Sequence, residues 1–365
     1  MHILWFNWRD IKNPDAGGAE VFTHEVMRRL AAKGYSATLF TSEYAGCSEN
    51  ETIDGINIIR SGNKYQVYKR AIEYYRKHQS DYDLIIDEIN TRPFLTPRFV
   101  KNKPIIALFH QMAREFWFYE TPFPLNYIGY YYLEEKWLSN YRDIPTITVS
   151  ASSRQDLEEL GFKHIFIVPE GLSITPLPEV PEKEQEPTII FTGRLKKAKL
   201  PHHAVKAFSL IKKEIPTAKM WVVGGGYMLE KLKKMDVPGI TFYGHISSDL
   251  KNQLMSKAHV ALVPAVREGW GLVVTESNAM GTPAVAYNVH GLRDSVHNGH
   301  TGILVKENTP EELAAETIAL LRDKERLAKL SYEALKQSRT FSWDKTAEAF
   351  DDIIKKVASS YPWGA

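Results

Sequence analysis

Short apolar runs rich in β-branched and aromatic residues alternate with helix-patterned stretches along almost the whole chain. Ile3–Phe6 predicts the first strand. Val21–Leu30 predicts a helix, because its apolar residues recur every three or four positions and stop before Gly34. Such alternation is typical of parallel sheets covered by helices. We therefore expect a doubly wound α/β fold with further strands at 37–40, 56–60, 84–87, 105–110, 147–150, 165–168, 188–192, 220–223, 240–243, 260–263, 283–287 and 303–305.

The alternation is interrupted once, by a stretch rich in proline and glutamate from Ser173 to Pro187. Proline and like charges favour an extended, poorly packed segment. A chain of 365 residues is long enough for two domains. We therefore predict a first domain over 1–175, a linker over 176–187 and a second domain over 188–340. Two such domains facing each other favour a ligand in the cleft outside the carboxyl ends of the strands.

The chain carries 46 lysines and arginines against 44 aspartates and glutamates, a formal net charge of +2. That balance creates no general field to attract nucleic acid, so we expect no DNA or RNA partner. Cys47 is the single cysteine, which excludes a disulfide within the chain. The first residues lack the pattern of a secretory signal, and no apolar run reaches the roughly 20 residues needed to span a bilayer. We therefore expect a cytoplasmic protein.

Two glycine-rich stretches follow expected strands. Gly17 and Gly18 lie between the first strand and the first helix, where a close backbone approach and the exposed helix amides favour an anion. A tight turn is the other interpretation of this pair. Gly225 lies in the triple glycine at 224–226, where a nucleotide contact and a plain strand-to-helix turn fit the pattern equally well.

A basic loop follows the first expected strand of the second domain. Arg194 and Lys199 stand at the carboxyl end of that strand, where a guanidinium fork and an ammonium group would neutralise a diphosphate leaving group. Lys196 and Lys197 in the same loop are expected to be solvated surface residues.

The stretch from 264 to 283 carries the most specific pattern, two glutamates with glycines next to the first. Glu268 follows a strand and is placed to hold sugar hydroxyls. Glu276, about one turn into the next helix, is placed to accept two hydrogen bonds from a ribose diol. The alternative is an ordinary ion pair of either glutamate with Arg267 or Arg293. A close backbone approach and a helix start together favour an anion at Gly269, Trp270, Gly271 and Leu272.

His110 ends an expected strand of the first domain, as Asp87–Asn90 ends another. A single histidine in a buried strand is more often structural, whereas its place at the carboxyl edge of the sheet favours a functional role. Nine of the seventeen residues in 116–132 are aromatic. So many aromatic residues suit either a core or a half-wet surface, such as an acceptor groove or a bilayer interface.

In their order and spacing, these stretches resemble the family 4 retaining glycosyltransferases of the GT-B fold, over essentially the whole chain. The match rests on Gly17–Glu20, Gly193–Lys199, the glycines at 224–226 and Glu268–Pro283. The resemblance implies two Rossmann-like domains, with a nucleotide-diphosphate-sugar held mainly by the second and an acceptor held by the first. It also implies a last helix, within 341–365, that crosses back onto the first domain.

The resemblance also assigns roles to the motif residues. It implies a diphosphate site at Arg194 and Lys199, phosphates near Gly17 and Gly18, the ribose at Glu276, the transferred sugar at Glu268, and a histidine beside that sugar at His110. Two positions depart from the family pattern. Leu200 stands where glycine commonly follows the lysine, and Glu170 stands where asparagine is usual. No role is carried over to either position.

The activity that the resemblance implies is a retaining hexosyl transfer from a UDP- or GDP-sugar to a hydroxyl of a glycan or lipid-linked acceptor. We expect domain closure that excludes water, cations that stabilise the departing diphosphate, same-face attack, and no metal or other cofactor. The aromatic segment 116–132 would suit peripheral contact with the inner membrane face. The alternatives are a nucleotide-sugar epimerase or a glycoside phosphorylase on the same scaffold, and a nucleotide-sugar-binding module without turnover.

Overall fold

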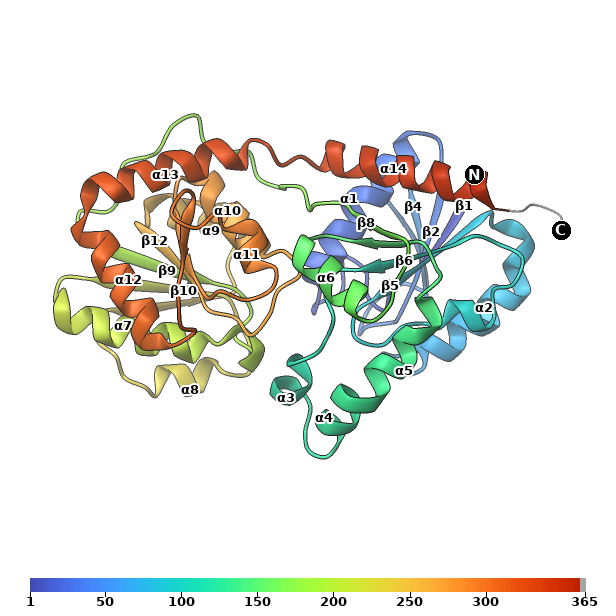
Figure 1. Ribbon diagram of the computed structural model, residues 1–365, viewed down its shortest axis with the longest axis horizontal. Helices are drawn as coiled ribbons and strands as arrows, with labels where there is room; N and C mark the ends of the chain where they lie inside the picture. Colours follow the sequence, from blue (N-terminus) through green and yellow to red (C-terminus); the bar gives the residue numbers. More distant parts are fainter. Residues whose placement is uncertain (362–365) are drawn as a thin grey trace. The chain divides into compact units, whose positions relative to one another are not determined.

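The computed structural model describes residues 1–361 and divides into two compact units (Figure 1). Unit 1 contains residues 1–114, 127–171 and the described chain from 342 onward, and unit 2 contains residues 115–126 and 172–341. Positions 362–365 of the expected last helix lie outside the described residues. Each unit has its own α/β sheet.

Unit 1 is built around a mainly parallel sheet. Its strands are β1 (His2–Phe6), β2 (Ser36–Thr41), β3 (Asn50–Ile53), β4 (Ile56–Arg60), β5 (Leu84–Ile89), β6 (Ile105–Phe109), β7 (Thr146–Thr148) and β8 (Ile165–Ile167). Its helices are α1 (Gly18–Ala32), α2 (Val67–His78), α5 (Glu134–Leu138), α6 (Ala151–Glu159) and α14 (Trp343–Ser360), with short helical turns η1 (Gln79–Asp81), η2 (Thr96–Arg98), η3 (Gly129–Leu133) and η4 (Ser139–Tyr141). Among the described residues this sheet has eight strands, in the order β3-β4-β2-β1-β5-β6-β7-β8.

Unit 2 is built around a parallel sheet. Its strands are β9 (Thr188–Thr192), β10 (Lys219–Val223), β11 (Ile240–Gly244), β12 (Val260–Val263), β13 (Ala284–Ala286) and β14 (Gly302–Leu304). Its helices are α3 (Phe116–Glu120), α7 (Pro201–Glu214), α8 (Leu229–Lys233), α9 (Ser248–Lys257), α10 (Leu272–Ala279), α11 (Leu292–Ser295), α12 (Pro310–Arg322) and α13 (Lys324–Ser338), with the turn η5 (Lys197–Lys199). The short helix α4 (Leu125–Ile128) spans the boundary between the units. Within the described chain the strand order is β11-β10-β9-β12-β13-β14.

The expected strands are all present, with some ends shifted by one or two residues. One strand was not expected: β3 pairs antiparallel with β4. The turn between them is Asp54–Gly55, whose φ angles of +49° and +79° are the left-handed pair that a two-residue hairpin requires. Because β3 is short and largely exposed, it carries too little apolar pattern to be recognised as a strand.

Both sheets have a point where the strand order reverses. In unit 1 the reversal lies between β1 and β5, and in unit 2 it lies between β9 and β12. Ligands of open α/β sheets bind outside the carboxyl ends of the strands at such a point. The loops at these two points are 7–17 and 90–96 in unit 1, and 193–199 and 264–271 in unit 2.

The last described helix, α14, packs on unit 1, where Figure 1 shows it beside α1. Phe350 stacks on Trp5 of β1 with ring centroids 5.2 Å apart, and its ring also meets Phe22 of α1. Asp351 accepts hydrogen bonds from Lys33 and Tyr35 at 2.9 and 2.6 Å. A buried aromatic stack and two polar contacts thus fix α14 to the unit that carries His110.

Candidate active site

In unit 2 the two loops at the reversal point are bonded to each other. The Val266 amide donates to the Ala198 carbonyl oxygen at 3.0 Å, and Lys199 Nζ forms an ion pair with Glu268 Oε1. The Lys199 and Glu268 side chains are 25% and 13% exposed. The structure therefore brings two predicted site residues together, in surroundings partly shielded from water.

Glu276 lies in α10, the helix that begins at Leu272. Its Oε2 lies 2.6 Å from Nζ of Lys251, a residue of α9 that sequence reasoning missed. In the described chain both site glutamates thus form ion pairs, but with Lys199 and Lys251. The ion-pair alternative was wrong in its partners, because it named only the arginines near in sequence.

Close backbone approaches explain two of the three glycines that follow β10. A Cβ on Gly224 would lie 2.0 Å from the Gly193 carbonyl oxygen, and a Cβ on Gly226 would lie 2.5 Å from the Leu195 carbonyl oxygen. A Cβ on Gly225 would have nothing within 4 Å. The turn interpretation therefore accounts for Gly224 and Gly226, whereas Gly225 has the open space that a ligand contact needs.

The backbone around Glu268 is equally confined. A Cβ on Gly291 would lie 2.3 Å from the Glu268 carbonyl oxygen, so a turn of the chain passes directly against this residue. Gly271 has a φ of +92°, a left-handed conformation that glycine adopts without penalty, and it starts α10. Trp270 meets Phe341 edge to face, with centroids 5.6 Å apart. These contacts confine the backbone of the Glu268 loop.

The basic loop after β9 contains Arg194, which is half-buried and directly precedes the buried Leu195. Leu200 follows Lys199 with φ +48° and ψ +42°, in the left-handed region. Glycine is usual at this position in the family pattern because it tolerates that conformation. The leucine side chain is 5% exposed and joins the core of unit 2. The departure from the pattern thus keeps the turn and adds an apolar contact.

In unit 1 the predicted glycine pair begins α1. The Gly17 amide donates to Oε2 of Glu20 at 2.6 Å, and Oε1 of Glu20 accepts from Nε of Arg9 at 2.9 Å. Arg9 also donates to the Asp15 carbonyl oxygen at 2.6 Å. The Gly17 amide is therefore engaged within the chain, and the helix start beyond it, from Gly18, presents the remaining first-turn amides.

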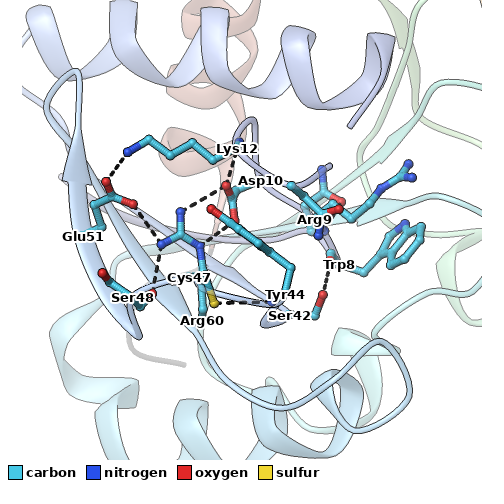
Figure 2. A network of polar contacts seen from close by, with 12 residues as sticks. Trp8, Arg9, Asp10, Lys12, Ser42, Tyr44, Cys47, Ser48, Glu51 and Arg60 are labelled. Carbon is cyan, nitrogen blue, oxygen red and sulfur yellow. Dashed lines mark hydrogen bonds and ion pairs between the residues drawn. The ribbon is translucent and has the colours of Figure 1, made fainter. Parts of the chain in front are cut away.

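A buried ion pair also holds the loop that leads to Gly17, at Asp10 (Figure 2). Arg60, at the end of β4, donates to the two oxygens of Asp10 at 2.8 and 3.1 Å, and both side chains are 0% exposed. A further guanidinium nitrogen of Arg60 lies 3.0 Å from Glu51, which also pairs with Lys12. Because every charge in this network has a partner of opposite sign, the network fixes the loop that leads to Gly17.

His110 lies between two carboxylates of unit 1. Its Nδ1 lies 3.4 Å from Oε1 of Glu170, and its Nε2 lies 3.3 Å from Oε1 of Glu88. Burial alone would lower the pKa of His110, but the hydrogen bond with Glu170 and the negative charges of Glu170 and Glu88 raise this pKa to about 10. His110 is therefore an imidazolium near neutral pH. Its ring and the Phe22 ring form a T-shaped contact with centroids 5.1 Å apart.

Glu88 is fully buried and tied to its neighbours. Its Oε2 accepts a hydrogen bond from Nε1 of Trp5 at 2.8 Å and another from the Thr23 hydroxyl. Its Oε1 lies 3.4 Å from Nδ2 of Asn90. Sequence reasoning placed Glu88 at a strand end but gave it no partner. For Glu170, the signal that could have revealed a role was its departure from asparagine.

The helix α3 comes from the first half of the sequence but belongs to unit 2. Oε1 of Glu120 accepts hydrogen bonds from the Ala198 amide at 2.9 Å and from the Tyr227 hydroxyl at 3.1 Å. Glu115 pairs with Arg267 at 2.9 Å. Sequence reasoning missed these contacts because they join residues more than 70 positions apart, which no local pattern encodes.

Many large side chains of the aromatic segment 116–132 are exposed. Phe123 and Tyr132 are 79% and 71% exposed. Large exposed side chains of the segment are Phe118, Tyr119, Phe123, Leu125, Tyr127, Ile128, Tyr131 and Tyr132. The core interpretation is therefore wrong for these residues, and the half-wet surface interpretation fits them. No helix in residues 1–361 is both long and apolar enough to cross a membrane.

Two family profiles match consecutive parts of the chain. The profile described as "Glycosyltransferase Family 4" matches residues 16–175, and the profile described as "Glycosyl transferases group 1" matches residues 175–337. The chain belongs to the family 4 glycosyltransferases. Curated relatives of this glycosyltransferase include D-inositol 3-phosphate glycosyltransferase of Rhodococcus jostii, 29% identical over 192 residues that cover 49% of this chain and 42% of that protein. Another is glycogen synthase of Mycobacterium tuberculosis, 28% identical over 228 residues that cover 59% of this chain and 54% of that protein.

The matches thus span about half or less of the length of these relatives. Solved structures resemble the glycosyltransferase over nearly its whole length. Sucrose-phosphate synthase from Thermosynechococcus elongatus has a TM-score of 0.81 at 19% identity, over 98% of this chain and 99% of that chain. Anabaena HepE in complex with UDP-glucose has a TM-score of 0.73 at 16% identity, over 98% of this chain and 100% of that chain. The shared fold is GT-B.

Proposed function

We propose that this family 4 glycosyltransferase moves a hexosyl group from a UDP- or GDP-sugar to a hydroxyl of a glycan or lipid-linked acceptor, with retained configuration. The observation that carries the proposal is the pairing of Lys199 with Glu268 at the reversal point of unit 2. Glu276 lies in the helix that starts beside them. The solved complex of HepE with UDP-glucose supports a nucleotide-sugar donor.

The Lys199–Glu268 pair suits a donor that carries an anion next to hydroxyl groups. On binding, a phosphate oxygen would replace the carboxylate at Lys199, and sugar hydroxyls would replace the ammonium at Glu268. Arg194 would take a second phosphate oxygen through its guanidinium fork. In the same way, the ribose diol would exchange for Lys251 at Glu276. In the Lys199–Glu268 pair each partner thus keeps a charge-assisted hydrogen bond, so neither is left unpaired on binding.

In the transfer step, the acceptor oxygen forms a bond to the anomeric carbon while the bond from that carbon to the diphosphate breaks. Arg194 and Lys199 stabilise the charge that develops on the leaving group. The departing phosphate oxygen takes the proton of the acceptor hydroxyl from the same face, so no protein nucleophile is required. Because both nitrogens of His110 face carboxylates, we assign it a positioning and charge-setting role beside the sugar rather than proton transfer.

Metal-independent turnover follows from the same assignment, because Arg194 and Lys199 supply the positive charge that a divalent ion would otherwise bring to the diphosphate. Turnover is therefore expected to be equal with and without a metal chelator. A loss of turnover in chelator that added magnesium restores would contradict this assignment.

The central test incubates the full chain with UDP- and GDP-sugars and a panel of sugar acceptors, with Glu268→Ala as the control. Release of free nucleotide only with both donor and acceptor supports transfer. Isomerised donor without acceptor would indicate an epimerase, and tight donor binding without product would indicate a binding module. The anomeric coupling constant of the product, measured by NMR, must match that of the donor, because an inverted product contradicts the mechanism.

We further propose that the exposed aromatic segment contacts a membrane that holds a lipid-linked acceptor. The supporting observation is the exposure of Phe123 and Tyr132. The wild type is expected to sediment with lipid vesicles, whereas the Phe123→Ser/Tyr132→Ser variant should stay in the supernatant. Tyr332→Ser is the matched control, since Tyr332 is 59% exposed in α13. Equal activity on a water-soluble glycan, with no vesicle binding, would contradict the proposal.

A further inference from the structure

The two loops of unit 2 that carry Lys199 and Glu268, residues 193–199 and 264–271, are joined at Ala198. The carbonyl oxygen of Ala198 accepts a hydrogen bond from the Val266 amide at 3.0 Å, and the next residue, Lys199, pairs with Glu268. Ala198 is 2% exposed. Any group that binds the amide of Ala198 therefore acts on the point where the two loops meet.

The amide of Ala198 is bound by the helix α3. Oε1 of Glu120, the last residue of α3, accepts a hydrogen bond from this amide at 2.9 Å. The Tyr227 hydroxyl lies 3.1 and 3.0 Å from the two carboxylate oxygens of Glu120, and it accepts from the Lys197 amide at 2.8 Å. Glu120 thus holds two consecutive amides of the turn η5, one directly and one through Tyr227. Hydrogen bonds to an ionised carboxylate are among the stronger ones in proteins.

The other end of α3 holds the second loop. Oε2 of Glu115, the residue that precedes α3, accepts from Nε of Arg267 at 2.9 Å, and Arg267 is 6% exposed. Nη1 of Arg267 lies 3.1 Å from Nδ1 of His290, whose carbonyl oxygen accepts from the Glu268 amide at 3.0 Å. Glu115 therefore fixes the residue next to Glu268.

These contacts form a closed circuit of three segments. Glu120 binds the first loop at Ala198, Val266 joins the first loop to the second, and Glu115 binds the second loop at Arg267. In a closed circuit, one loop cannot shift without breaking a contact of another. Side chains that bind ligands are held in place by supporting hydrogen bonds of this kind.

Core packing does not account for the position of α3. The helix has five residues and none of them is buried. Phe118 and Tyr119 are exposed. So short a helix is not stable by its own hydrogen bonds. Its two flanking carboxylates reach the loops of the proposed donor site, so the contacts of α3 bear on these loops more than on the core of unit 2.

We infer that α3 positions the two donor loops for transfer, with Glu120 acting through Lys199 and Glu115 acting through Glu268. The inference rests on the proposed transferase function and adds two positioning residues to it. Glu120 orients the turn that ends at Lys199, whose ammonium would meet the diphosphate. Glu115 orients Arg267 and hence the neighbouring Glu268, which would meet the transferred sugar.

The two glutamates should leave different signatures in donor binding. Calorimetry compares UDP with UDP-glucose, and GDP with GDP-glucose, on the full chain. Glu120→Ala is expected to raise the Kd of the nucleotide and of the nucleotide sugar at least tenfold, because both carry the diphosphate. Glu115→Ala is expected to raise the Kd of the nucleotide sugar at least fivefold and that of the nucleotide less than twofold. A purely structural role would raise both values equally in both variants.

A double variant tests whether Glu120 acts through Lys199. In Lys199→Met no ammonium remains to be positioned, so adding Glu120→Ala should change the Kd of the nucleotide less than twofold. A tenfold effect in both backgrounds would overturn the inference. Glu120→Gln keeps an acceptor oxygen for the Ala198 amide and should bind within threefold of the wild type.

Folding is controlled in the same experiments. Because Glu120 is exposed, water can reach the Ala198 amide in Glu120→Ala, and the urea midpoint should equal that of the wild type. If this variant does not fold, Tyr227→Phe replaces it, since loss of the hydroxyl frees the Lys197 amide and should raise both Kd values at least threefold. The matched control is Glu230→Ala, because the Glu230 side chain is 74% exposed in α8 and should be dispensable for binding.

The inference and the proposed function fail separately. Nucleotide-sugar binding by the wild type that neither Glu120→Ala nor Glu115→Ala weakens would overturn the inference and leave the transferase supported. Binding that shows both signatures, in a chain that transfers no sugar, would contradict the transferase and support the positioning of a bound donor. A wild type that binds none of the four ligands contradicts the proposed donor and overturns the inference with it.

Discussion

Oε1 of Glu170 lies 3.4 Å from Nδ1 of His110, on the opposite side of the ring from Glu88. The family pattern has a neutral asparagine at this position, so the glutamate adds a second negative charge to a buried histidine. Burial opposes protonation of His110, yet the two carboxylates together raise its pKa to about 10. A residue that would titrate near neutrality thus becomes a fixed cation.

Glu170→Gln is expected to lower the pKa of His110, because the glutamine keeps a hydrogen-bonding group but loses the charge. The folded-state pKa of about 10 lies above the value of 6.5 for a free histidine, so protonation of His110 stabilises the fold. That stabilisation is fully present below about pH 6.5 and is lost as pH rises through about 10. The free energy of unfolding of the wild type should therefore exceed that of the variant most near pH 6, and the difference should shrink toward pH 10.

Urea denaturation at several pH values measures this difference, and NMR titration of the imidazole measures its pKa directly. Glu158→Gln is the control, since Glu158 pairs with Arg154 on an exposed face of α6. Its difference from the wild type should not follow the same pH window. A His110 pKa that stays unchanged in Glu170→Gln would contradict the assignment.

The left-handed backbone at Leu200 predicts an unusual order of stability between its alanine and glycine variants. Its left-handed backbone costs about 1–2 kcal/mol for a residue other than glycine, and its buried side chain compensates through apolar contacts. Leu200→Ala loses the contacts and keeps the strain, so it should cost about 2–5 kcal/mol. Leu200→Gly loses the same contacts but relieves the strain.

Leu200→Gly should therefore be as stable as Leu200→Ala or more stable, whereas glycine inside a helix is less stable than alanine by about 1 kcal/mol. Hydrogen exchange of amides in α7 and urea midpoints provide the measurement. A glycine variant that is about 1 kcal/mol less stable than the alanine variant would show that backbone strain at Leu200 is negligible.

The parts of the fold that follow from local pattern were predictable. Buried parallel strands such as Ile105–Phe109 read as apolar runs because helices cover both of their faces. The edge strand β3 was missed because it is mostly exposed, although Asp54–Gly55 carries the turn signal. Motif spacing also placed Lys199 and Glu268 each in a loop that follows a strand, and the structure pairs them because those two strands are neighbours.

The partners of the site residues were not predictable, because they come from distant parts of the chain. Lys251 reaches Glu276 from another helix, and Glu120 reaches Ala198 across 78 positions. Neither contact leaves a periodic or spacing signal. Glu170 did leave a signal, its difference from the family asparagine. The sequence does not show, however, that His110 is the residue that this added charge contacts.

Glu276 is expected to act in donor binding more than in the chemical step. Loss of the charge-assisted hydrogen bonding to the ribose should weaken binding by about 1.5–3 kcal/mol in total, so Glu276→Ala should raise the donor KM by about 10- to 100-fold. The kcat should change much less, because the ribose lies away from the anomeric carbon. Steady-state kinetics with a UDP-sugar and its 2′-deoxy analogue measure both effects.

The wild type should discriminate against the deoxy analogue, and Glu276→Ala should treat both donors alike. Glu325→Ala, at an exposed position of α13, is the control and should retain the discrimination. An unchanged preference in Glu276→Ala would remove this residue from the ribose site.

The buried pair of Arg60 and Asp10 predicts strong coupling between two positions that are 50 residues apart in the sequence. Removing one member of a buried pair leaves an uncompensated charge and costs about 3–5 kcal/mol, whereas removing both charges costs less. Arg60→Met should therefore destabilise unit 1 more than the Arg60→Met/Asp10→Asn double variant does. Arg70→Met, at an exposed position of α2, is the control and should change the free energy of unfolding by less than about 0.5 kcal/mol.

The same pair should also affect binding, because Asp10 lies in the loop that leads to Gly17 (Figure 2). The double variant restores charge balance but not the two directed hydrogen bonds, so the loop is freer than in the wild type. We therefore expect it to recover most of the stability while keeping a raised donor KM, measured by the same steady-state kinetics. Recovery of both stability and KM would mean that the pair contributes to folding alone, and that Gly17 is positioned by Glu20 without help from Arg60.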